Sequence, residues 1–594
     1  MVQRMYSGIS RIKKIIVMVL MLNALIFSML ILSSCDEDED EMTVSSGNID
    51  IQNDVPEQII TIDVVRDPGK PDRNVSNNSD GVENESLDEG EALSYSDKPV
   101  CTYVKPGKVK YDISFSNGIP SSDDGKVYLF EVSTYENEGS LDGKSPLASA
   151  DCKESMTFSV EYKQRYLFSR FVSAVLSGGK YIPVSGGVYI TNPGELASVT
   201  KANPKAGKKG LLIDTTMMGT DNLNSLNPSR IIYNIPLSYI VGETTNAANP
   251  TVNYEYNGKT YHFNGQNLML FDSVFTNMTN AGYHCTAILL NDKNPGHPEL
   301  IHPLSRGGSG NYYAFNTEEE NGVRLMEATA LFLAERYTKG DHGMVYDWVI
   351  GNEVNQHKIW NYMACDDVDK YAESFERSFR IFYNAIKSKY SNAKVYYSID
   401  HDWNDNGGNN SGFFNAKDFL AAFNKYGKSR GNYNWSLAIH PYPVPLTNVK
   451  FWEGSFDKSE NAKTLTPMNL STLTSVMTRD EYLNSSGNVR DITITELGFS
   501  SVQGENLQAA AYAYCYYIVD KNPYISAFIL NRQTDDPTEM KDGLAFGIYN
   551  MDHSAKYLTN VYKNVGTEAG NAYIPEMLSV IGASSLDEAL SKAR

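Results

Sequence analysis

The sequence predicts an α/β protein in which a (β/α)8 TIM barrel follows a small all-β domain of sandwich type. From about residue 225, strand-like runs alternate with helix-like runs, and eight such units fit into roughly 340 residues. Two strand-like runs end in a glutamate, Glu353 and Glu496, at the position where a parallel barrel presents catalytic groups. A doubly wound sheet is the alternative fold, but such sheets rarely need eight strands.

Residues 1–35 are expected to form a lipoprotein signal peptide. Four basic residues within the first 14 precede the apolar stretch 15–32, which is the order found in export signals. The following Leu32-Ser33-Ser34-Cys35 resembles a bacterial lipobox, and the resemblance implies that Cys35 is lipidated and becomes the first residue. A retained anchor helix is the alternative, because a stretch of this length also spans a membrane.

Residues 36–99 are expected to be a disordered acidic linker. They hold 19 acidic and 4 basic residues with few aromatics, so they bury too little apolar surface to fold. The six acids of residues 36–41 resemble a surface-export signal of some gut bacteria, or they simply begin the tether. We therefore expect a lipid-anchored protein of the bacterial cell envelope that faces outward, with no membrane contact besides the anchor.

The net charge of −20 arises mostly in this linker, and residues 100–594 carry −9. No basic face indicates nucleic acid as a partner. We expect a monomer without a cofactor.

Residues 100–205 are predicted to form the β-sandwich-like domain. Short runs bounded by Gly, Pro, Asn and Asp, several of them alternating in polarity, are typical of such folds. The expected strands are 109–115, 126–132, 156–161, 165–171 and 187–191. A structural spacer is favoured over a separate carbohydrate-binding module. Cys101 and Cys152 lie close enough in sequence to pair, whereas Cys285 and Cys515 lie in apolar runs that indicate buried thiols.

Residues 206–594 are assigned to the barrel. The expected strands, one to eight, are 230–235, 285–290, 312–315, 345–350, 394–399, 436–439, 492–495 and 525–530. A hairpin at 253–263 should turn at Asn257-Gly258, a strong hairpin signal. Helices are expected at 265–281, 317–337, 368–389, around 473–483 and at 507–519, and Thr317 begins a capping-box pattern for the second of them.

The two glutamates suit glycoside cleavage. That reaction passes through an oxocarbenium-like state and needs one carboxylate as nucleophile and one carboxylic acid to protonate the leaving oxygen. Asn352 directly precedes Glu353, and the two glutamates follow the fourth and seventh expected strands. This pattern resembles clan A of the glycoside hydrolases, the retaining 4/7 barrels, over about residues 225–565, and within it an uncharacterised family of exported bacterial barrel lipoproteins.

The resemblance implies roles for individual residues. Glu353 would be the acid/base, with a raised pKa, and Glu496 the nucleophile. Asn352 would bind the sugar 2-hydroxyl; otherwise it is a loop cap. His440 and Tyr442 follow the sixth expected strand, where clan A enzymes often place a residue that orients the nucleophile.

Further residues are predicted to bind substrate. Asp400 and His401 follow the fifth expected strand, where they are expected either to contact substrate or to support the residues that do. A metal site in Asp400-His401-Asp402 is disfavoured because adjacent residues cannot all face one ion. Trp360, Trp403 and Trp452 are expected as exposed indoles on the rim, or else as covers of loop cores. Arg532 takes the place after strand eight where the clan commonly has tryptophan.

The sequence thus predicts a retaining hydrolase of poly- or oligosaccharides. No serine-hydrolase elbow, zinc-protease motif or phosphate-binding glycine loop is present. Two alternatives remain: a surface lipoprotein whose barrel binds glycan without cleaving it, and a structural or adhesive surface protein.

Overall fold

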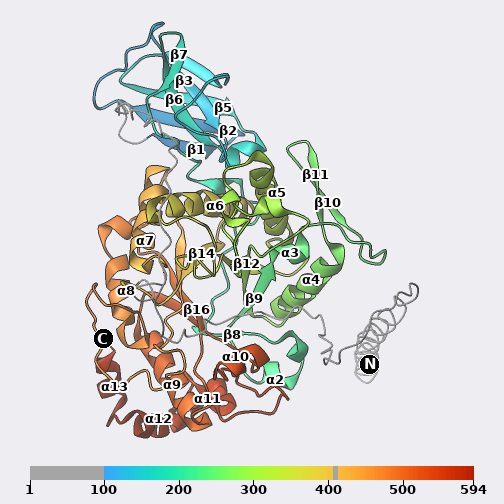
Figure 1. Ribbon diagram of the computed structural model, residues 1–594, viewed down its shortest axis with the longest axis vertical. Helices are drawn as coiled ribbons and strands as arrows, with labels where there is room; N and C mark the ends of the chain where they lie inside the picture. Colours follow the sequence, from blue (N-terminus) through green and yellow to red (C-terminus); the bar gives the residue numbers. More distant parts are fainter. Residues whose placement is uncertain (1–98, 406–411, 594) are drawn as a thin grey trace, which may run out of the picture. The chain divides into compact units, whose positions relative to one another are not determined.

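The computed structural model describes residues 99–405 and 412–593 (Figure 1). The signal peptide, the lipidation of Cys35 and nearly all of the acidic linker therefore lie outside the described residues. Within the described part, no helix is both long and apolar enough to cross a membrane.

The first described domain consists of two antiparallel sheets with apolar side chains between them. In strand β2 buried and exposed residues alternate, as its polarity pattern predicts. Tyr111, Phe158 and Phe171 lie in the shared core. The three-stranded sheet comprises β1 (Val100–Val104), β2 (Lys108–Ser114) and β5 (Ser155–Glu161). The four-stranded sheet comprises β4 (Ala148–Asp151), β3 (Lys126–Val132), β6 (Arg170–Ser177) and β7 (Lys180–Pro183).

Two expected strands of this domain are wrong, and one possible disulfide does not form. The run 165–171 begins as a 3-10 helix, Gln164–Leu167, and the strand starts only at Arg170. The run 187–191 forms isolated bridges and no strand, because it pairs through single residues with two different partners. Cys101 and Cys152 are not paired; all five described cysteines are free, and Cys285 and Cys515 are buried as expected.

The second domain is a closed barrel of eight parallel strands, which confirms the predicted fold class. Each strand pairs with its neighbours in chain order, and β17 pairs with β8 to close the barrel. The strands are β8 (Lys209–Leu212), β9 (Arg230–Pro236), β12 (His284–Leu290), β13 (Val345–Ile350), β14 (Lys394–Ile399), β15 (Ser436–Ile439), β16 (Ile492–Leu497) and β17 (Ile525–Leu530).

The predicted strand count contained two errors that cancel. The first strand is β8, a four-residue strand with little sequence signal, so β9 is the second strand and β12 the third. The run 312–315 is not a strand, since it makes only single bridges to Ile301 and Tyr362. β13 and β16 are nevertheless the fourth and seventh strands, as predicted.

Helices surround the strands (Figure 1). The hairpin has its turn where predicted, with positive φ at Asn257 and Gly258, between β10 (Val252–Tyr256) and β11 (Lys259–Phe263). Thr317 is not the N-cap of α5 as its capping-box pattern predicted, because α5 begins at Glu320 and its N-cap is Glu319. The longer helices are α4 (Gly265–Asn280), α5 (Glu320–Tyr337), α6 (Val368–Lys389), α7 (Ala416–Ser429), α8 (Leu470–Met477) and α9 (Glu505–Lys521). The short helices are α2 (Asp221–Asn224), α3 (Leu237–Ile240), α10 (Pro537–Lys541), α11 (Leu558–Asn564), α12 (Ile574–Ile581) and α13 (Leu586–Lys592).

The barrel interior is filled by side chains, as in other barrels of eight strands. A separate apolar cluster occupies it, and the half-buried Tyr312 packs against that cluster from the segment after β12. Its members are Leu212, Ile232, Ile288, Leu290, Val349, Tyr396, Ala438, Ala527 and Ile529. Because the interior is closed, a substrate site has to be built from the loops at the strand ends.

Candidate active site

Glu353 and Glu496 both lie at the carboxyl-terminal end of the barrel. Glu353 follows β13 by three residues, and Glu496 is the penultimate residue of β16. Parallel strands present these ends on one face, so the fold brings together two residues 143 positions apart in the sequence.

The backbone around Glu353 is held in an uncommon conformation. Gly351 has a φ of 79° and Glu353 a φ of 40°, which is the left-handed region that costs a non-glycine residue about 1–2 kcal/mol. The loop is secured by hydrogen bonds to the next strand: the Glu353 amide donates to Ser398 Oγ and the Val354 amide to the Ser398 carbonyl, both at 2.9 Å. Such residues cluster at functional sites, so this conformation agrees with a functional role for Glu353.

His440 connects the strand that carries Glu496 to Glu353. Its Nδ1 lies 2.9 Å from Glu353 Oε1, and its Nε2 lies 2.9 Å from Thr495 Oγ1. His440 is fully buried, and burial lowers its pKa even though the charges of Glu496 and Asp400 act to raise it. We infer a neutral ring in which Thr495 donates to Nε2 and Nδ1–H donates to Glu353. The clan resemblance implied that His440 would orient the nucleophile, whereas its contact is with Glu353.

Tyr442 is the residue that contacts Glu496. Its hydroxyl donates to Glu496 Oε1 at 2.9 Å and accepts from Asn531 Nδ2 at 3.0 Å. Burial raises the pKa of Glu496, and the raised pKa expected at Glu353 stays a prediction. The neighbouring Glu353 raises the Glu496 pKa further, while His440, Tyr442 and Arg532 oppose the rise. Glu353 is therefore close enough to Glu496 for its charge to affect the ionisation of Glu496.

Asp400 is fully buried and is not available to a sugar. Its carboxylate accepts from Asn355 Nδ2 at 2.7 Å and from Gln356 Nε2 at 2.5 Å. Of its two expected roles, Asp400 therefore has the supporting one and not substrate contact: it holds the loop that follows Glu353. His401 is partly exposed, with its Nε2 3.6 Å from Asp402 Oδ1, and its substrate role stays a prediction.

Of the two positions expected for the tryptophans, Trp360 and Trp403 have the buried one and are not exposed on the rim. Trp403 is fully buried and donates from Nε1 to the Glu460 carbonyl, so it covers a loop core. Trp360 is 6% exposed, with its ring centre 5.9 Å from that of the half-buried Tyr312. Trp452 is partly buried against the main core. Tyr312 lies near Glu496: burial raises the pKa of Tyr312 most, and the charges of Asp292 and Glu496 raise it further.

Arg532 lies near Glu496 and also contacts Asp536 and Glu539. Its guanidinium is 2.8 Å from Asp536 Oδ2 and 3.3 Å from Glu539 Oε1, and its proximity acts to lower the Glu496 pKa. It therefore acts on the carboxyl pair electrostatically, and direct substrate contact stays a prediction. Asn352 is half-buried between Gly351 and Glu353, where its predicted contact with a sugar hydroxyl also stays a prediction.

The sequence model of a family described as "Family of unknown function (DUF5722)" matches residues 201–589. The chain belongs to this family. The match spans the whole barrel and both glutamates, so the family shares the segment that carries the candidate active site. No curated protein sequence matches the chain.

Solved structures similar to this DUF5722 protein include glycoside hydrolases. One is a family 39 glycoside hydrolase from the gut symbiont Bacteroides cellulosilyticus, at 13% identity and a TM-score of 0.42, covering 80% of this chain and 83% of that one. Another is a family 1 β-glucosidase from Thermotoga maritima, at 11% identity and a TM-score of 0.37, with 59% of this chain and 85% of that one covered. A third is a xylanase 10C mutant from Cellvibrio japonicus in complex with xylopentaose. Its identity is 10% and its TM-score 0.37, with 78% of this chain and 92% of that one covered. With scores this low, nothing about activity follows, and the barrel is established by its own strand pairing.

Sequence reasoning missed several residues of this DUF5722 site. Ser398 and Thr495 are ordinary strand residues, and no local pattern distinguishes them. Glu539 is a fully buried acid in α10 whose pKa burial raises to about 8, assisted by the charges of Asp536 and Glu496 and opposed by Arg532. Only the packing of α10 reveals it. Among the described residues no group of His, Cys, Asp and Glu side chains is arranged to hold a metal ion.

Proposed function

We propose that this protein is a retaining glycoside hydrolase that cleaves a poly- or oligosaccharide by double displacement. The observation that carries the proposal is the pair of carboxyl groups, Glu353 and Glu496, at the ends of strands four and seven. His440 forms a hydrogen bond with Glu353, and His440 and Glu353 both act on the pKa of Glu496. Retention requires the two carboxyl groups to lie about 5–5.5 Å apart.

In the first step the Glu496 carboxylate attacks the anomeric carbon, and the Glu353 carboxylic acid gives its proton to the leaving oxygen. Tyr442 holds the Glu496 carboxylate in place through its 2.9 Å hydrogen bond to Oε1. After proton transfer Glu353 is ionised, and the Nδ1–H of neutral His440 stabilises that charge. In the second step Glu353 takes a proton from water, which displaces Glu496 from the sugar.

Alanine variants separate the two roles. Glu496→Ala should abolish turnover while leaving glycan binding largely intact, because no covalent intermediate forms. Glu353→Ala should slow natural substrates most and slow substrates with a good leaving group less, because these need little protonation. Azide should rescue Glu353→Ala with a product of retained configuration, whereas azide acting on Glu496→Ala gives inversion.

A panel of plant and host glycans identifies the substrate. Glu481→Ala is the control for loss of a glutamate outside the site, because Glu481 is exposed and precedes β16. Wild-type activity in both active-site variants would refute the assignment. Glycan binding without any cleavage would favour the alternative of a non-catalytic glycan-binding lipoprotein.

We also propose that the protein is anchored to the cell envelope by a lipid on Cys35 and faces outward. The support is the lipobox-like sequence before Cys35 and the acidic segment after it. Mass spectrometry of the N-terminus of the protein purified from its host tests this. An unmodified Cys35 still joined to Ser34 would contradict it.

A further inference from the structure

A polar cavity of about 480 Å³ lies at the amino-terminal end of the barrel, opposite the candidate active site. Four consecutive strands lead away from it: Lys394 and Ser436 begin β14 and β15, and Asp491 and Tyr524 directly precede β16 and β17. The volume falls in the range of about 300–1,000 Å³ that is typical of small-molecule sites. The proposed hydrolysis makes no use of this cavity.

The lining of the cavity carries an excess of positive charge. It holds Lys387, Lys394 and Arg490 against the single carboxylate of Asp491, a formal balance of +2 in a chain of net charge −20. Lys394 is paired with Asp491. Lys387 donates to backbone carbonyls, including that of Ala393 at 2.9 Å, and Arg490 donates mainly to carbonyls as well. Two of the three cations therefore have no acidic partner within the lining.

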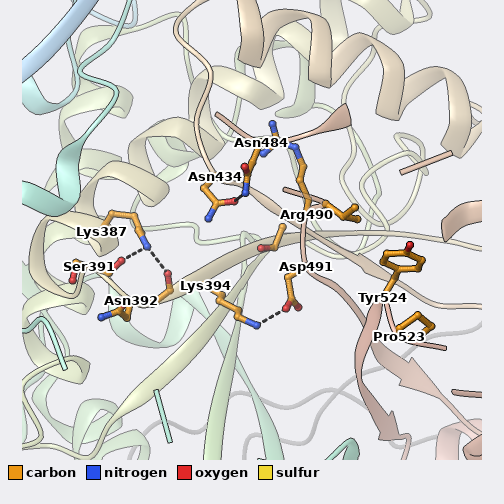
Figure 2. A pocket seen from close by; sticks show the side chains of 13 residues that line it. Lys387, Ser391, Asn392, Lys394, Asn434, Asn484, Arg490, Asp491, Pro523 and Tyr524 are labelled. Atoms are coloured by element: carbon orange, nitrogen blue, oxygen red, sulfur yellow. Dashed lines mark hydrogen bonds and ion pairs between the residues drawn. The ribbon is translucent and has the colours of Figure 1, made fainter. Parts of the chain in front are cut away.

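The side of the cavity that lies across from Lys387 is formed by Tyr524 and Pro523 (Figure 2). Tyr524 is 41% exposed beside the exposed Pro523, while Lys387 and Asn392 lie across the cavity with the Lys394–Asp491 pair between the two sides. Asn392, Asn434 and Asn484 also line the cavity. The Asn392 amide donates to two backbone carbonyls, and Asn484 Nδ2 donates to Asn434 Oδ1. The cavity thus combines an aromatic ring for the C–H face of a sugar, polar side chains for hydroxyl groups and ammonium groups for an anion.

We propose that this cavity binds a small acidic saccharide, with its carboxylate or sulfate near Lys387 and Lys394 and its ring against Tyr524. The two ammonium groups repel each other: burial first, and then the charge of Lys394, lowers the pKa of Lys387 to about 8. An anion placed between them relieves this repulsion. A neutral sugar gains the ring contact and the hydrogen bonds to polar side chains but not this charge interaction.

Isothermal titration calorimetry on the detergent-solubilised full-length protein tests the proposal with glucuronate, glucose 6-sulfate and glucose at pH 7. Both acidic sugars should bind at least about tenfold more tightly than glucose, the gain expected from one charge-assisted hydrogen bond. Lys387→Gln and Tyr524→Ala should each weaken glucuronate binding by at least about tenfold. Lys389→Gln is the matched control, because Lys389 lies on the same helix but pairs with Glu335.

Two further measurements locate the site. The charged groups nearest Lys387 in the lining are Lys394, which is paired with Asp491, and Arg490, whose buried guanidinium donates to backbone carbonyls. Loss of the Lys387 charge above a pKa of about 8 should weaken glucuronate binding about tenfold between pH 7 and pH 9. Glu496→Gln should bind glucuronate as the wild type does. The proposal would be overturned by equal affinity for glucose and glucuronate or by no binding at all. Unchanged binding in both cavity variants, or binding lost only in Glu496→Gln, would overturn it as well.

Discussion

Replacing Tyr442 with phenylalanine tests how the protein controls the charge of Glu496. The substitution removes one hydroxyl, which donates to Glu496 Oε1 and accepts from Asn531 Nδ2. The hydrogen bond from Tyr442 favours the ionised carboxylate and opposes the rise in the Glu496 pKa that burial causes. Its removal should therefore raise that pKa further.

The size of the effect follows from the strength of the bond. A hydrogen bond to a charged acceptor contributes about 1.5–3 kcal/mol. One pKa unit corresponds to about 1.36 kcal/mol, so the pKa of Glu496 should rise by about one to two units in Tyr442→Phe. The acid limb of kcat/KM reports the ionisation of the free enzyme and should move to higher pH by the same amount.

Carbon-13 NMR of the glutamate carboxyl carbons measures this without a known substrate, with Glu496→Gln to assign the resonance. Once a substrate is found, the pH profile of kcat/KM provides a second measurement. Tyr514→Phe is the control, since its buried hydroxyl donates to the Ala589 carbonyl away from the site. An acid limb that stays in place or moves to lower pH in Tyr442→Phe would refute the reasoning.

Two predictions concern stability. The pKa of Glu539 is raised from 4.5 to about 8, so the folded protein holds a proton that the unfolded chain releases, and stability should fall as pH rises through this window. Glu539→Gln should match the wild type below pH 4.5 and exceed it increasingly up to pH 8, by at most about 1.4 kcal/mol per pH unit, as measured by thermal unfolding. Glu481→Gln is its exposed control, and a gap that does not grow with pH would contradict the cause. In Gly498→Ala the new Cβ would lie 2.2 Å from the Asn531 carbonyl and 2.7 Å from Phe546, which should cost about 1–3 kcal/mol and disturb the contact to Tyr442. Gly186→Ala, where nothing lies within 4 Å, should be tolerated, and equal melting temperatures of the two variants would contradict the steric argument.

The barrel and its two glutamates were readable in the sequence because their signals are local. A strand buried on both faces appears as a continuous run of β-branched residues, and a glutamate at the end of such a run is placed at the strand end whatever surrounds it. The strand count was less secure. Lys209–Leu212 is too short to distinguish, and 312–315 has a strand-like composition although its backbone finds only single bridges.

The contacts of the site depended on the tertiary structure. His440 contacts Glu353 and Tyr442 contacts Glu496 because strands that are distant in the sequence lie close together in the barrel. The burial of Trp403 and Asp400, and the raised pKa of Glu539, depend on loops that pack over one another after separate strands. A residue's type states what it can bind, whereas its exposure and its neighbours are properties of the packed chain. The sequence therefore determined which residues end the strands, and only the fold decided which of them meet, which are buried and how burial changes their charge.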